Sequence, residues 1–237
     1  AMAELLYGDA NPSGKLAESY PLALSDTPAY PYRKLRGNCA EYRESIYVGY
    51  RYYDKAKVPL RYPFGFGLSY TRFAYEDLRL SEAGVRFRLR NTGSRAGAEI
   101  AELYICAAES ETFRPEKELK GFAKVFLKAG EEREVFIPFD DKSFRVFDSV
   151  ANRFLEESGR YRILIGASAA DIRLNGELVR AGEKLGRPDE KKRLPHYFSG
   201  AAQQIGRAEF ERLLGRKLER HPIAGELLRG DALHELR

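Results

Sequence analysis

The strict alternation of apolar and charged residues in the middle of the chain limits the possible folds more than any other sequence feature. Residues 85–90 read VRFRLR, and residues 159–166 read GRYRILIG, so apolar side chains recur at every second position. Successive side chains of an extended strand point to opposite faces, so each pattern predicts a strand with one buried and one solvated face. The arginines between them could bind acidic glycans, but a solvated sheet face is the ordinary interpretation.

Further strands are predicted over residues 98–106, 119–127, 133–139 and 172–179, with Asn175–Gly176 as a typical hairpin dipeptide in the last. Turn sequences such as Asn91-Thr92-Gly93-Ser94 separate them, and no helical pattern intervenes. About seven short strands at this spacing predict an antiparallel β-sandwich over residues 73–182.

The residues before this unit look different. Residues 1–7 favour a short helix with Gly8 after its end, followed by an Asn-Pro-Ser-Gly turn at residues 11–14. A helix this short needs a surface to lie on, so residues 1–22 are expected to end another domain. Residues 23–72 contain many prolines and tyrosines and predict a connector that runs over a surface, with a strand at residues 45–53.

The tail, residues 183–237, is expected to begin as a charged surface arm and to become helical. One helix is predicted from Phe210, Leu213 and Leu214, which share a face and precede Gly215. A second would start at Pro222, with an apolar stripe of Ile223, Leu227 and Leu228.

Charge and composition argue against several functional classes. The net charge of +5 comes from interleaved residues of both signs, whereas a nucleic-acid site gathers lysine and arginine on one face. No apolar run has the roughly 20 residues of a membrane span. The start of the chain lacks a signal-peptide pattern and Cys39 and Cys106 are the only cysteines, which favours a cytoplasmic location.

Neither cofactor nor metal is expected. His196, His221 and His234 lack metal-ligand spacing, and surface histidines are the simpler interpretation. Cys106 is expected to be a small buried residue. Asp9 and Asn11 lie in a glycine-containing turn, but no helix or lysine-serine pair follows, so turn capping is expected.

Several segments resemble one family. Residues 6–16 (LYGDANPSGKL) resemble the LLFGDxNPSGKLP signature of family 3 glycoside hydrolases, and residues 42–54 (YRESIYVGYRYYD) are similar to its YxEGIxVGYRYYD segment. Residues 62–71 (YPFGFGLSYT) resemble its YPFGHGLSYT. Residues 91–97 and 114–122 look like the fibronectin type III-like domain that ends such enzymes. Ser45 and Phe66 depart from the family's usual glycine and histidine.

The resemblance implies a mainly β chain. It would comprise the end of an α/β sandwich domain (1–22), an aromatic connector (23–72), a fibronectin type III-like, immunoglobulin-like β-sandwich (73–182), and a charged arm with a helical tail (183–237). Family members are mostly retaining hydrolases of β-glucosides or β-xylosides, which use two carboxyl groups about 5–5.5 Å apart. Both catalytic positions of the family would precede residue 1, and none of the 35 carboxylates lies in a matching motif. No catalytic residue is therefore predicted in this chain.

The leading hypothesis is a non-catalytic C-terminal portion that braces the catalytic domains of a glycoside hydrolase, in cis or in trans. Tyr42, Arg43 and Glu44 are its candidate substrate-proximal residues, since they are close to the aromatic segment and the family resemblance places them near a sugar cleft. The alternative is that Glu44 pairs with a nearby arginine while the tyrosines pack a domain joint.

A second hypothesis is a stand-alone module, because a short apolar helix with no surface to lie on favours docking or self-association. Its partner would be an oligosaccharide or a second copy of the chain in a homodimer.

Overall fold

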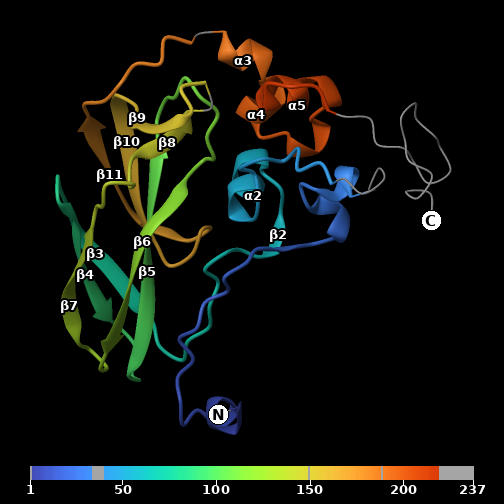
Figure 1. The fold of residues 1–237 in the computed structure, drawn as a ribbon. Coiled ribbons are helices and arrows are strands. Elements are labelled where there is room, and N and C mark those ends of the chain that lie inside the picture. Colours follow the sequence, from blue (N-terminus) through green and yellow to red (C-terminus); the bar gives the residue numbers. More distant parts are fainter. Residues whose placement is uncertain (1, 34–39, 149, 188, 219–237) are drawn as a thin grey trace, which may run out of the picture.

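A computed structural model describes residues 2–33, 40–148, 150–187 and 189–218, and two facing antiparallel sheets form its centre (Figure 1). One sheet has the strand order β11-β10-β5-β6 and the other the order β3-β4-β7. This arrangement confirms the predicted sandwich. Its strands are β3 (Phe73–Ser81), β4 (Gly84–Asn91), β5 (Gly97–Ala107), β6 (Glu118–Leu127), β7 (Glu132–Pro138), β10 (Gly159–Gly166) and β11 (Ile172–Arg180).

The alternating residues of β4 lie as predicted. Val85, Phe87 and Leu89 point between the sheets and are fully buried in the core. Arg86 lies on the other face, where its guanidinium pairs with Glu134 of the adjacent strand at 3.2 Å. Burial of the apolar face drives the sheets together, while the arginines stay at the solvated face.

The predicted hairpin at Asn175–Gly176 is wrong, because both residues lie inside the single strand β11. Gly176 pairs with Ile163 of β10, and the pairing is regular on both sides of this position. A Cβ atom at position 176 would lie 2.8 Å from a methyl carbon of Leu80 on β3. The glycine therefore permits a close approach of the facing sheet instead of forming a turn.

The strand predicted at residues 45–53 is also wrong. Residues 43–46 form a turn, and helix α2 runs from Tyr50 to Ala56. Gly49, which precedes the helix, has φ 56° and ψ −140°, a conformation that is essentially restricted to glycine. Aromatic residues favour a strand only where side chains of a neighbouring strand can pack against them. Here the aromatic side chains pack into two different hydrophobic clusters instead.

Four short strands lie outside the sandwich. β8 (Arg145–Asp148) and β9 (Arg153–Glu156) form an antiparallel hairpin that the sequence patterns did not predict. β1 (Tyr20–Pro21) and β2 (Leu60–Tyr62) pair the two ends of a connector segment that also holds the short 3-10 helices η1 (Leu24–Asp26) and η2 (Tyr30–Tyr32).

The tail carries α3 (Glu190–Arg193), α4 (Pro195–Ser199), η3 (Ala202–Gln204) and α5 (Arg207–Leu214). The predicted helix before Gly215 is confirmed, and Gly215 caps it with φ 73°. The expected surface arm is partly wrong, since the tail buries apolar side chains against the connector. We call this cluster the tail core; its buried members are Tyr47, Tyr52, Tyr53, Leu194, Tyr197, Ala202 and Ile205. The predicted helix from Pro222 lies outside the described residues.

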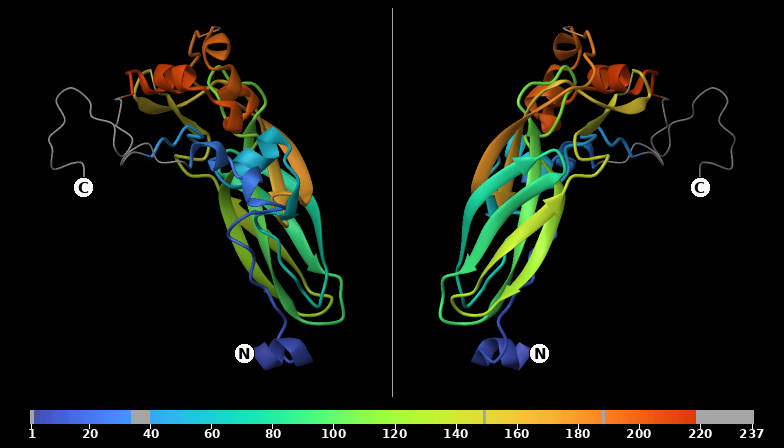
Figure 2. Two further views of the ribbon diagram at one scale, coloured as in Figure 1. Left: turned by 90° about the vertical axis from the view of Figure 1, so that its right-hand side faces the viewer. Right: turned by 90° about the vertical axis from the view of Figure 1, so that its left-hand side faces the viewer.

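Helix α1 (Met2–Tyr7) is confirmed, with Gly8 at φ 80° after its end. Two views at right angles agree that α1 lies at one end of the molecule and the tail helices at the other (Figures 1 and 2). Among the described residues, no helix is both long and apolar enough to cross a membrane.

Candidate functional site

The tyrosine-rich segment of residues 41–70 lies between the sandwich and the tail. On the sandwich side, the Tyr50 ring lies 5.8 Å from that of Tyr104 on β5 and 5.1 Å from that of Phe64. Its hydroxyl accepts a hydrogen bond of 2.8 Å from the backbone N–H of Leu119. One side of α2 is thereby fixed to the four-stranded sheet.

On the tail side, two tyrosines exchange hydrogen bonds with each other's segments. The Tyr47 hydroxyl donates to the backbone carbonyl of Tyr197, and the Tyr197 hydroxyl donates to the carbonyl of Arg43 at 2.9 Å. Burial raises the pKa of both hydroxyls, so they remain protonated donors at neutral pH. The tyrosines of this segment therefore pack the joint between two cores.

The three candidate residues occupy separate environments. The Tyr42 side chain is 73% exposed. Arg43 pairs with Glu41 at 2.5 Å and donates to the carbonyl of Ile205 at 3.2 Å. Glu44 is only 5% exposed, and its Oε2 has no hydrogen-bond partner within the part of the chain that the structure describes. The structure does not bring the trio together as one binding site.

The carboxylates of this segment are not arranged as a free pair. Glu41 is neutralised by Arg43, and Asp54 accepts a 2.6 Å ion pair from Lys117. Burial raises the pKa of Asp54, and Lys117 opposes this rise. The alternative interpretation expected Glu44 to pair with a nearby arginine, but Arg43 pairs with Glu41, and no ion pair of Glu44 is found among the described residues.

The structure shows the surroundings of Ser45 and Phe66, the two positions that depart from the family pattern. Ser45 has φ 53°, the left-handed region that glycine adopts without strain, which explains a glycine there in the family pattern. Phe66 packs its ring 4.9 Å from that of Tyr62 and lines a polar pocket.

This polar pocket of about 690 Å³ lies between residues 63–75 of the chain and the loop from β10 to β11. Lys15 Nζ contacts Glu99 Oε1 and the carbonyl of Ala167, each at 2.5 Å. Tyr75 donates to Glu99 at 3.1 Å. Burial raises the pKa of the Tyr75 hydroxyl. Lys15, Glu99 and Tyr75 therefore form one hydrogen-bonded network in the wall of the pocket.

A second hollow, which we call the apolar groove, has a volume of about 780 Å³ and lies beside Tyr42. Connector, loop, hairpin and tail each contribute to it. Its main apolar side chains are Phe113, Phe147, Phe154, Phe210, Leu213 and Leu214. Sequence patterns missed it because it needs the unpredicted β8–β9 hairpin and the packing of α5 on the connector.

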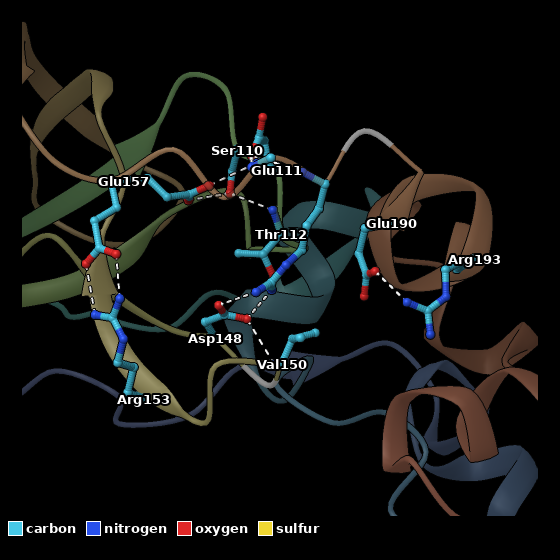
Figure 3. A network of polar contacts seen from close by, with 12 residues as sticks. Ser110, Glu111, Thr112, Asp148, Val150, Arg153, Glu157, Glu190 and Arg193 are labelled. Atoms are coloured by element: carbon cyan, nitrogen blue, oxygen red, sulfur yellow. Dashed lines mark hydrogen bonds and ion pairs between the residues drawn. The ribbon is translucent and has the colours of Figure 1, made fainter.

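A network of ion pairs ties the tail to the β8–β9 hairpin (Figure 3). Arg187 forms a two-pronged pair with the buried Asp148, one prong measuring 2.8 Å, and holds the pKa of that carboxyl below its usual range. Arg153 and Glu183 form a second two-pronged pair at 2.8 and 2.5 Å. Bidentate pairs fix orientation as well as distance, so they set where the tail crosses the hairpin.

Glu157 extends this network on the sandwich side (Figure 3). It accepts hydrogen bonds from the Ser110 hydroxyl at 2.5 Å and from the Glu111 N–H at 2.9 Å. Arg114 Nε lies 3.6 Å from the same carboxylate. No sequence motif marked these acids, whose side chains find their partners 30 or more positions away, apart from the Val150 N–H beside Asp148.

The remaining candidates have structural surroundings. Asn11 accepts from the Tyr70 N–H at 2.9 Å and donates to the carbonyl of Ala96 at 3.1 Å, so it joins connector to sandwich. Cys106 is buried. His196 Nδ1 lies 2.6 Å from Glu209 Oε2. Within the described ranges, no group of three or more histidine, cysteine or acidic side chains could hold a metal ion. Cys39, His221 and His234 lie outside the described residues.

Two family models match the chain. Residues 1–70 match the glycosyl hydrolase family 3 C-terminal domain, and residues 99–169 match the fibronectin type III-like domain. The first therefore ends where the connector meets the sandwich, and the second lies within the sandwich.

Curated relatives share this region. The chain is 47% identical over 180 residues to the probable beta-glucosidase K of Emericella nidulans, covering 75% of this chain and 21% of that protein. It is 43% identical over 193 residues to the thermostable beta-glucosidase B of Acetivibrio thermocellus, covering 78% and 25%. The chain thus spans about a fifth to a quarter of the curated relatives it matches.

Solved structures agree. The GH3 beta-glucosidase of Bifidobacterium adolescentis superposes with a TM-score of 0.74 at 34% identity, over 77% of this chain and 28% of that one. The beta-glucosidase 3B of Thermotoga neapolitana, solved with alpha-D-glucose, has a TM-score of 0.69 at 38% identity, over 75% and 26%.

Proposed function

Because the chain belongs to glycoside hydrolase family 3 and corresponds to the C-terminal region of its members, we propose that it is a non-catalytic part that docks on and braces the catalytic domains of a β-glucosidase- or β-xylosidase-type enzyme. The relatives carry this region within a much longer chain, which supports an association with the rest of such an enzyme.

Helix α1 is the observation that carries the proposal. All of its residues are exposed, including Met2, Leu6 and Tyr7. Tyr70 donates to the carbonyl of Leu5 at 2.6 Å, which positions the helix without covering its apolar side chains. A six-residue helix is unstable alone in water, so a surface contributed by the remaining domains would stabilise it.

The outer face of β6 supplies a second apolar surface. Phe122 and Phe126 are 66% and 58% exposed, although Val125 and Leu127 on the other face are buried. Phe126 lies opposite Ala98 of β5, two residues after Ala96, whose carbonyl accepts a hydrogen bond from Asn11. Large exposed aromatic side chains at such positions are typical of interaction surfaces.

Of the three candidate residues, Tyr42 is the one that this proposal places at a cleft, since its ring is exposed beside the apolar groove. Arg43 is held by its contacts with Glu41 and the Ile205 carbonyl, and Glu44 is buried. Their role in this proposal is to hold the connector in place.

A chimera tests the proposal. The aligned region of the Acetivibrio thermocellus enzyme would be replaced by the matching residues of this chain. We expect β-glucosidase activity in the chimera, and a loss of at least about tenfold in the Phe122→Glu/Phe126→Glu variant, because two charges would enter an apolar contact.

The matched control is Phe136→Glu on β7, which lies in the other sheet and should leave activity within about twofold. Full activity in the double variant would contradict the docking face. The isolated chain should not hydrolyse aryl β-glucosides or β-xylosides; turnover above that of a heat-denatured sample would refute a non-catalytic role.

The alternative, a stand-alone carbohydrate-binding or assembly module, has one observation in its favour. The polar pocket holds lysine, carboxylate and tyrosine groups of the kind that bind sugar hydroxyls. Calorimetric titration with gluco- and xylo-oligosaccharides decides this, since no heat at millimolar ligand removes the sugar-binding version. Light scattering decides the homodimer version, which a monomer at micromolar concentration would exclude.

A further inference from the structure

We propose that part of the connector and the tail helices form a clamp that can open while the β-sandwich stays folded. The clamp consists of connector residues 22–33 and 40–48 and of tail residues 190–214, and it closes on helix α2 (Figure 1). Both halves of the clamp belong to this chain, so its opening does not depend on the proposed docking to catalytic domains.

The clamp has a hydrophobic core that is separate from the core between the two sheets. The tail core joins Tyr47 of the connector turn and Tyr52 and Tyr53 of α2 to buried residues of the tail. In the part of the chain that the structure describes, none of its buried members belongs to the buried core of the sandwich. Tyr197 and Ala202 are fully buried at this contact. Burial of these apolar groups holds the halves together, so separation of the halves would expose them together.

Hydrogen bonds join the two halves of the clamp in both directions. From the connector, the Tyr32 hydroxyl lies 2.7 Å from the carbonyl of Ala202 and 3.1 Å from that of Ile205. From the tail, the side-chain amide of Gln203 donates to the carbonyl of Ser25 at 2.7 Å. Each half therefore satisfies backbone carbonyls of the other, and opening would leave both without these partners.

The connector turn is held by the tail more than by the sandwich. The Arg43 carbonyl accepts the Tyr197 hydroxyl at 2.9 Å, and the Arg43 guanidinium donates to the Ile205 carbonyl at 3.2 Å. Toward the sandwich, the Tyr47 hydroxyl lies 3.3 Å from the carbonyl of Arg114. The described backbone-to-backbone hydrogen bonds of residues 22–33 and 40–48 are all local, so strand pairing does not anchor this segment.

The clamp lies between two anchors that do not belong to it. Helix α2 is fixed beside the start of β6, since its Asp54 pairs with Lys117 at 2.6 Å. The tail is fixed to the β8–β9 hairpin before the clamp begins, by the pair of Arg187 and Asp148 at 2.8 Å. The clamp can therefore open without breaking either anchor, which is the behaviour of a local unfolding unit.

Opening of the clamp has a consequence for the surface beside Tyr42. In the closed state, the exposed Tyr42 ring stands next to the apolar groove. Ser45 and Ile46 line this groove from the connector turn, whereas Phe210 and Leu213 line it from α5. Separation of the two halves would take the groove apart. The clamp is thus a conformational device that sets whether the turn presents Tyr42 beside an apolar surface.

Native-state hydrogen exchange of the full chain tests the clamp. The amides of Ser45, Tyr47 and Phe210 donate hydrogen bonds within it. In urea below the unfolding transition, we expect these amides to exchange at least about tenfold faster than those of β4, after correction for intrinsic rates. Amides of both halves should respond to urea alike, because one opening exposes them all.

Two tyrosine-to-phenylalanine variants test whether the halves open together. Tyr197→Phe removes the donor to the Arg43 carbonyl, and Tyr32→Phe removes the donor to the Ala202 carbonyl. Each should speed exchange about tenfold in both halves of the clamp, because a carbonyl of the joint loses its partner. The matched control is Tyr75→Phe, which removes a hydroxyl from β3 of the sandwich and should change exchange in the clamp by less than about twofold.

Exchange of the β4 amides reports whether the sandwich of each variant remains folded. Acceleration by Tyr197→Phe in the tail alone, with Ser45 and Tyr47 unchanged, would overturn the proposal, since the halves would then open separately. So would equal acceleration of β4, or clamp amides as well protected as those of β4 in the unmodified chain, because the chain would then be one folding unit. The proposal would also fail if neither variant speeds exchange in the clamp.

Discussion

Ser45 carries backbone strain that its neighbours do not share. Its φ of 53° is one of four positive values among the described non-glycine residues, and the others are lysine, aspartate and asparagine. The left-handed region costs a residue with a Cβ atom roughly 1–2 kcal/mol. The turn before α2 imposes this φ, because Tyr47 must enter the tail core directly after it.

Ser45→Gly should therefore raise the free energy of unfolding by about 1 kcal/mol, the strain relieved minus the greater chain entropy of glycine. Chemical denaturation measures this change. Ser94→Gly is the control, since Ser94 is not among the positive-φ residues and should show no gain. An equal gain at both positions would show that strain at residue 45 is not the cause.

Glu44 is the other unusual residue, a buried carboxylate whose Oε2 has no hydrogen-bond partner among the described residues. A buried charge without a partner lowers the stability of the folded protein. For a paired charge, removal of the partner lowers that stability. Glu41 and Glu44 thus provide both cases within four residues.

Glu44→Gln is expected to leave stability unchanged or to raise it by about 1 kcal/mol, because the amide keeps the shape and removes the charge. Glu41→Gln should lower it by about 1 kcal/mol, because Arg43 loses its carboxylate. Urea unfolding of both variants at neutral pH compares them. A large loss for Glu44→Gln would mean that the charge has a favourable role that this arrangement does not explain.

Among the elements, α2 shows how packing overrides local preference. Its tyrosines would suit a strand, but Tyr50 packs on β5 while Tyr52 and Tyr53 pack on the tail. A strand would place alternate side chains on opposite faces of one sheet, and none of the described strands lies in position to pair with residues 50–56. Gly49 makes the sharp entry into the helix possible.

Gly49→Ala should cost about 1–3 kcal/mol from the backbone conformation alone, because a Cβ atom at this position meets nothing within 4 Å. Gly14→Ala is a matched control: that position is equally open and its φ is not positive. Thermal unfolding should show a clear loss for the first and little change for the second. Equal losses would contradict the conformational explanation.

Some elements could be predicted from the sequence and others could not. Strands such as β4 and β10 could be predicted because each has one buried and one solvated face, so that apolar and polar residues alternate along the sequence. The turn predicted at Gly176 was wrong because the glycine instead makes room for the Leu80 side chain, which is 96 positions away in the sequence. The apolar groove and the environment of Glu44 could not be predicted, since both depend on the tail packing over the connector.

At the scale of the whole molecule, the connector is held between the sandwich and the tail. The tail core covers one side of α2, and the Arg187–Asp148 and Arg153–Glu183 pairs fix where the tail leaves the sandwich (Figure 3). Stability of this arrangement should depend on pH through Asp148. Arg187 lowers the pKa of this carboxyl in the folded state, so the stabilisation is present above its unfolded pKa of about 3.9 and is lost as the pH falls.

Asp148→Asn should therefore lower the free energy of unfolding by about 2 kcal/mol at neutral pH, the contribution of a hydrogen-bonded buried charge. The difference from the unmodified chain should shrink as the pH falls through the region of about 4 and below, where the folded-state carboxyl also takes up its proton. Asp141→Asn is the control, because Asp141 is 64% exposed and its pair with Arg145 should contribute almost nothing. Urea unfolding across this pH range measures both variants. A pH-independent loss for Asp148→Asn would mean that the residue acts through packing, and the tail would then be held by the tail core instead of by this ion pair.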